Sequence, residues 1–150
     1  MRTTNRVSTK ALAVFGAVLA LTLADLGVAN AKPGGVPAIP LNNGQETPGA
    51  TGGSSGFFSY SINGTEFCYT LSARGLSVPA VAAHVHVAPR NTAGPVVIPL
   101  MVGSGTDWTV QNCTTASATV LQAITASPGS YYVNVHTPTF PAGEIRGQLK

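Results

Sequence analysis

Charged side chains are scarce in this chain, at 9% of its 150 residues. From residue 32 onward there are five basic and four acidic residues, a net charge of 5 − 4 = +1, so most of the overall +3 belongs to the first 31 residues. These nine residues are Lys32, Arg74, Arg90, Arg146 and Lys150 against Glu46, Glu66, Asp107 and Glu144. No basic patch remains, which excludes nucleic acid as a partner. A composition rich in Ser, Thr, Asn and Gly with few charges is typical of a β-rich extracellular module.

The first 31 residues have the pattern of a secretory signal peptide. Arg2, Arg6 and Lys10 give a positive start, residues 11–23 form an uncharged apolar run, and Ala29-Asn30-Ala31 is a small-x-small cleavage site. The apolar run is shorter than the roughly 20 residues needed to cross a bilayer. We therefore expect cleavage after Ala31, secretion by the general route, and no membrane attachment afterwards.

Residues 32–150 are enough for one domain with its own core. The Pro- and Gly-rich residues 32–38 are expected to be a flexible entry segment, and residues 39–150 the folded domain. Cysteine is also scarce, with only Cys68 and Cys113. In an oxidising compartment a lone pair predicts a disulfide. The alternative, two metal thiolates, is disfavoured by that compartment and by the wide spacing.

Short β-patterned runs separated by Gly, Pro and Asn predict an all-β fold, either a sandwich or a barrel. The clearest signal is Asn63-Gly64, which predicts a two-residue hairpin turn between residues 56–62 and 65–71. One short helix is expected at residues 115–127, ended by Pro128-Gly129. Further strands are expected at 81–87, 95–102, 106–110, 131–136 and 144–149.

Histidine is rare, and all three histidines lie in two of these strand-like runs. Because side chains alternate along a strand, His84 and His86 share one face, with Cα atoms roughly 6.5–7 Å apart. His136 shares a face of its own run with Tyr132 and Asn134. If the two runs are neighbours in the sheet, the three imidazoles converge.

Three neutral imidazoles suit zinc or copper(II) as a bound ion. Pairing residues 131–136 with 144–149 as a hairpin would bring Glu144 and Arg146 to the same polar face. Glu144 is then a candidate fourth ligand, a group that orients a ring, or an ion-pair partner of Arg146. The competing interpretation is that all these side chains lie on the wet face of a half-buried sheet.

Signals for catalysis are thin, and no catalytic residue is predicted. Residues 52–56 (GGSSG) match the Gly-x-Ser-x-Gly pattern, but a nucleophile elbow needs a strand before the serine and a helix after it. Here a loop precedes the serine and a strand follows it. We interpret the segment as a turn.

Four segments together resemble the CHRD domain, a module named for its repeats in chordin and also found alone in secreted bacterial proteins. The resemblance extends from about residue 39 to residue 150. It rests on residues 41–48 (LNNGQETP), 82–86 (AAHVH), 132–137 (YVNVHT) and 143–149 (GEIRGQL). It implies an immunoglobulin-like, Greek-key β-sandwich, here of about eight short strands with one short helix. The residues that would matter for any shared function are His84, His86, Asn134, His136, Glu144 and Arg146.

These observations favour a secreted binding module that holds copper or zinc through three histidines. The alternative is a metal-free module that binds another extracellular protein or a cell-wall component. A third hypothesis is a small copper enzyme acting on superoxide, because His84-Val85-His86 is similar to the start of the metal site in copper/zinc superoxide dismutase. Three histidines are too few for both metals of that enzyme.

Overall fold

The computed structural model describes residues 38–150, so the predicted signal peptide and nearly all of the predicted entry segment lie outside the described residues. The described part is mostly antiparallel β-structure, which confirms the all-β prediction with eight strands and one α-helix. No helix within it is long and apolar enough to cross a membrane. The elements are β1 (Ile39–Asn42), η1 (Asn43–Gln45), β2 (Ser55–Asn63), β3 (Glu66–Arg74), β4 (Ala82–Val87), β5 (Val96–Leu100), β6 (Trp108–Thr115), α1 (Ala118–Ala126), η2 (Pro128–Ser130), β7 (Tyr131–His136) and β8 (Ile145–Gln148).

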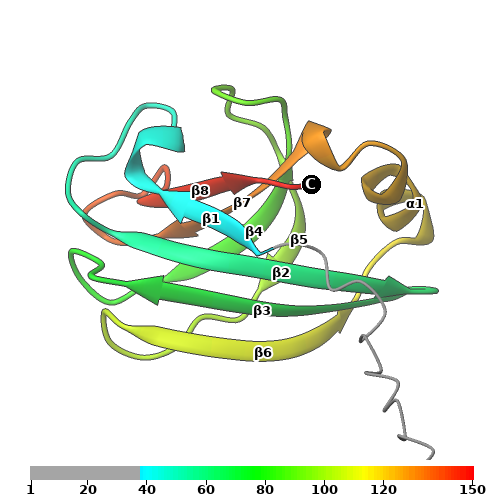
Figure 1. Ribbon diagram of the computed structural model, residues 1–150, viewed down its shortest axis with the longest axis horizontal. Helices are drawn as coiled ribbons and strands as arrows, with labels where there is room; N and C mark the ends of the chain where they lie inside the picture. Colours follow the sequence, from blue (N-terminus) through cyan, green and yellow to red (C-terminus); the bar gives the residue numbers. More distant parts are fainter. Residues whose placement is uncertain (1–37) are drawn as a thin grey trace, which may run out of the picture. The chain divides into compact units, whose positions relative to one another are not determined.

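The eight strands are hydrogen-bonded in one continuous sheet, in the order β5-β4-β7-β8-β1-β2-β3-β6. The sheet curves around a common core, so that β2, β3 and β6 form the front of the view in Figure 1 while β4 and β7 lie behind, with β1 and β8 joining the two halves at the top. A sandwich was expected to have two separate sheets; here its two layers are the two halves of one continuous, curved sheet. Its edges are β5 and β6.

The core forms between the two halves because successive side chains point to opposite faces of each strand, and those that point inward are mostly apolar. Phe58 and Phe67 come from the front half, and Val85 and Val133 from the rear half; all four are fully buried. Helix α1 lies at one end of the sheet (Figure 1), and its buried residues Leu121 and Ile124 belong to the same core.

The bounds differ most at β6, expected at 106–110 but extending over Trp108–Thr115, and at α1, expected at 115–127 but limited to Ala118–Ala126. One turn also differs. The β2–β3 hairpin closes with the pair Asn63–Glu66, so the turn residues are Gly64 and Thr65 and not Asn63-Gly64. Only Gly64 has a positive φ, of 61°, as a type II′ turn requires. Strand β1 was not predicted, because its four residues include Pro40 and are too few to show a period.

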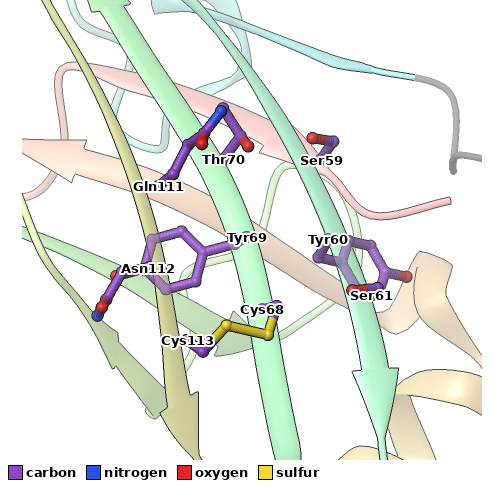
Figure 2. A pocket seen from close by; sticks show the side chains of 9 residues that line it. All are labelled: Ser59, Tyr60, Ser61, Cys68, Tyr69, Thr70, Gln111, Asn112 and Cys113. Atoms are coloured by element: carbon purple, nitrogen blue, oxygen red, sulfur yellow. A yellow bond between two sulfur atoms is a disulfide. The ribbon is translucent and has the colours of Figure 1, made fainter.

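The predicted disulfide is confirmed. Cys68 of β3 and Cys113 of β6 face each other across the two strands, with Cα atoms 3.9 Å apart and sulfur atoms 2.08 Å apart. The bridge lies on the outer side of the front half, in a shallow open depression of about 530 Å³ (Figure 2). It links the edge strand covalently to its neighbour.

Candidate metal centre

The three histidines come together because β4 and β7 are antiparallel neighbours. Their register places Ala82 opposite His136 and His84 opposite Asn134. The ring centroids are 5.0 Å apart for His84 and His136, and 5.5 Å apart for His84 and His86. One nitrogen from each ring lies within 4.8 Å of the others. The predicted convergence of the three side chains is therefore what the structure shows.

The His86 ring is held with one nitrogen free. Its Nδ1 lies 2.8 Å from the carbonyl oxygen of Gly94, which can only accept a hydrogen bond, so Nδ1 carries the proton. Nε2 therefore has a lone pair. That nitrogen is buried and has no hydrogen-bond partner in the neutral ring among the described residues. The Asn134 side chain, whose Oδ1 also has no partner, lies close enough to raise the pKa of the ring. A buried acceptor without a partner is uncommon and calls for an explanation.

The other two rings are arranged in a similar way. His136 Nδ1 lies 3.0 Å from the carbonyl oxygen of Pro141, so its Nε2 also has the lone pair. That Nε2 is 3.1 Å from Nδ1 of His84, which donates to it in the absence of an ion. A backbone carbonyl behind the ring is the usual way in which a protein orients a metal-binding histidine.

Electrostatics favour neutral rings. Burial lowers the pKa of His84, His86 and His136 below the usual 6.5, and the neighbouring histidines lower the pKa of His84 and His136 further. At neutral pH the rings are therefore unprotonated, the form that binds metal ions.

The polar face that contains the histidines is partly covered, since His86 is buried and His84 and His136 are half-buried. Arg146 is only 1% exposed, and its guanidinium donates to the carbonyl oxygens of Thr92 and Pro89 at 2.9 and 3.0 Å. Gln148 Nε2 donates to the carbonyl oxygen of Ala88 at 2.8 Å. These bonds fix the loop of residues 88–94 over the strands. The loop in turn supplies the carbonyl group that orients His86.

A stack of flat groups supports His86 from one side. The ring of Tyr132 is nearly parallel to it, with centroids 4.7 Å apart and planes at 7°. The guanidinium carbon of Arg146 lies 3.4 Å from the centroid of the Tyr132 ring. Tyr132 and Arg146 therefore lie where the sequence placed them, on the histidine face.

Glu144 lies in a different network from the histidines. Its carboxylate is fully buried and accepts hydrogen bonds from Ser54 Oγ, from Thr137 Oγ1, and from both the amide and the hydroxyl of Ser77, at 2.5 to 2.8 Å. Burial raises its pKa, but these four bonds outweigh burial and leave the pKa below its usual value. Glu144 joins three loops together. Ser54, the serine of the Gly-x-Ser-x-Gly pattern, has a structural role in this network.

Glu46, which the sequence did not single out, is the acid beside the polar face. It is 7% exposed, and burial raises its pKa to about 7, although the nearby Arg146 guanidinium and a hydrogen bond from Asn134 lower it. Gly143 packs so closely that a Cβ there would collide with the Glu46 carboxyl and the Asn134 amide. The only sequence signal for Glu46 was its place in the segment LNNGQETP, which has no periodic pattern.

Fold and site together define an all-β module with one disulfide and a buried polar cluster beside three converging histidines. Comparison with protein families gives the more specific assignment. The CHRD domain model matches residues 38–149, and the chain belongs to that family. No curated protein and no solved structure matches the chain.

Proposed function

We propose that this protein is a secreted CHRD module that holds one transition-metal ion, copper or zinc, through His84, His86 and His136. The observation that carries the proposal is Nε2 of His86, a buried lone pair without a partner, in a ring fixed by the Gly94 carbonyl group. An ion at this point gives that nitrogen the partner it lacks.

The spacing of the nitrogen atoms agrees with such an ion. Two nitrogens bound tetrahedrally to zinc at about 2.05 Å are about 3.3 Å apart. His84 Nδ1 and His136 Nε2 are 3.1 Å apart. Binding requires that the ion displace the proton shared between these two rings and that His86, whose nearest ring nitrogen lies within 4.8 Å of theirs, move toward the ion.

Three neutral imidazoles leave the charge of the ion uncompensated and a coordination position open. Both zinc and copper(II) accept this donor set. The proposed role is binding, sequestration or transport of one ion, because three histidines cannot build the two-metal site of a copper/zinc superoxide dismutase. Secretion is supported by the leader pattern of residues 1–31 and by the disulfide.

Calorimetric titration of zinc(II) and copper(II) into metal-free protein tests the proposal. We expect one ion per chain with a dissociation constant of about 1 μM or tighter, near −8 kcal/mol. A His84→Ala/His86→Ala variant that retains its circular dichroism spectrum and disulfide should lose this binding.

Glu66→Gln is the matched control, because Glu66 lies next to the disulfide in the other group of potential ligands. It should bind as the unchanged protein does. Equal binding by the double histidine variant would refute the site, and the absence of any binding would leave a metal-free interaction module as the function.

A further inference from the structure

The two edges of the sheet differ in how they are protected against pairing with another strand. At one edge, Pro99 lies inside β5, and Pro95 directly precedes the strand. Proline lacks the donor that an added strand would need. At the other edge, β6 has the sequence WTVQNCTT, with no proline, glycine or charge. Figure 1 shows β6 at the border of the front half, and within residues 38–150 it pairs only with β3.

The register shows which backbone groups of β6 point outward. The Cα atoms of Cys68 and Cys113 are 3.9 Å apart, which marks a pair without mutual backbone hydrogen bonds. The amide of Ala116 donates to the carbonyl oxygen of Thr65, so this pair is hydrogen-bonded. Hydrogen-bonded and non-hydrogen-bonded pairs alternate along the two strands, and both observations give the same assignment. It follows that four residues of β6 direct both N–H and C=O away from β3. These are Thr109, Gln111, Cys113 and Thr115, all of them exposed.

An uncharged edge strand of eight residues, without proline or a bulge, is a template for strand addition. Soluble proteins normally block such an edge with lysine, proline or a bulge. The bulge found in the opposite half of the sheet, between Val85 and His86, protects the β4–β5 side and leaves β6 open.

We propose that β6 pairs with β6 of a second copy of this chain, antiparallel, about a twofold axis at Asn112. This register alone gives a partner to every outward group of the strand, because the four outward positions are symmetric about residue 112. Thr109 then pairs with Thr115 of the second copy, and Gln111 with Cys113, in about eight backbone hydrogen bonds.

The strand is complementary to itself. No charge lies on it, so no like charges meet, and threonines at both ends form favourable cross-strand pairs. An isologous twofold contact closes the assembly at two copies. The depression in Figure 2, with Gln111 and Cys113 on one wall, would continue into its counterpart across the axis. This inference is independent of metal binding.

Sedimentation of the full chain, produced in the bacterial periplasm, tests the proposal between about 1 μM and about 1 mM. We expect a concentration-dependent shift from one copy to two. Thr109→Lys with Thr115→Lys places ammonium groups opposite each other at both ends of the contact and should abolish the dimer. Thr109→Glu with Thr115→Lys changes the same positions but makes both contacts attractive, and it keeps a lysine opposite Glu66 of β3 as in the first variant, so the dimer should persist.

Val96→Lys, at an exposed position on the β5 edge, is the control and should leave the dimer intact. A single copy at every concentration would overturn the proposal. So would a dimer that resists the two lysines, or one that responds equally to the lysine–lysine and lysine–glutamate variants.

Discussion

Replacing Glu46 with glutamine is expected to make the protein more stable at alkaline pH and to leave its stability at acid pH nearly unchanged. The pKa of Glu46 is raised from 4.5 to about 7 by burial. The folded state therefore binds a proton more tightly than the unfolded chain does. The stability linked to this proton is fully present below pH 4.5 and is lost as the pH rises through about 7.

The magnitude follows from the size of the shift. The difference of 7 − 4.5 = 2.5 units corresponds to about 3 kcal/mol of unfolding free energy at about 1.4 kcal/mol per unit. Glutamine keeps the shape and polarity of the side chain but cannot ionise. The advantage of Glu46→Gln over the unchanged protein should therefore grow by about 3 kcal/mol between about pH 4 and about pH 8.5.

Urea unfolding of both proteins at several pH values, with a chelator present, measures this difference. Titration of the histidines affects both proteins equally and cancels. Glu144→Gln is the opposite control. The pKa of the Glu144 carboxyl is lowered in the folded protein, so the stability that this carboxylate contributes is lost as the pH falls. Parallel pH profiles for Glu46→Gln and the unchanged protein would refute the argument that Glu46 is a buried, proton-binding carboxyl.

Three further predictions concern the site and its support. Gly94→Ala should cost about 2 kcal/mol or more in thermal unfolding and weaken zinc binding, because a Cβ would collide with the Val87 carbonyl group and displace the loop that orients His86. Gly129→Ala, where a Cβ meets nothing, should do neither; equal effects would contradict this account of the loop. Reducing the disulfide, which closes 45 residues, should cost about 4 kcal/mol in urea unfolding, and an unchanged midpoint would contradict this. Zinc affinity in a competition assay should fall only below pH 6.5, since the pKa of each histidine lies below that value, and loss of affinity at higher pH would contradict neutral rings.

The parts of the fold that follow a simple period could be predicted from the sequence. The two-residue period of side chains along a strand predicted that His84 and His86 share one face. The structure brings His136 to them through the β4–β7 pairing. The disulfide followed from cysteine number and compartment. These inferences need only local geometry or counting.

The acids could not be assigned in the same way. Glu144 precedes β8 and binds Ser54 and Ser77, which lie in loops distant in sequence, so no strand period reveals its partners. Glu46 comes close to Asn134 only because β1 joins the sheet beside β8. The cover over Arg146 is likewise a loop, held by backbone carbonyl groups that carry no sequence signature.

The metal site is the central claim, and anomalous diffraction from crystals grown with zinc tests it most directly. We expect one zinc ion at about 2.0–2.1 Å from Nε2 of His86, Nε2 of His136 and a ring nitrogen of His84. Rings still hydrogen-bonded to each other, with no zinc between them or with zinc bound elsewhere, would contradict it.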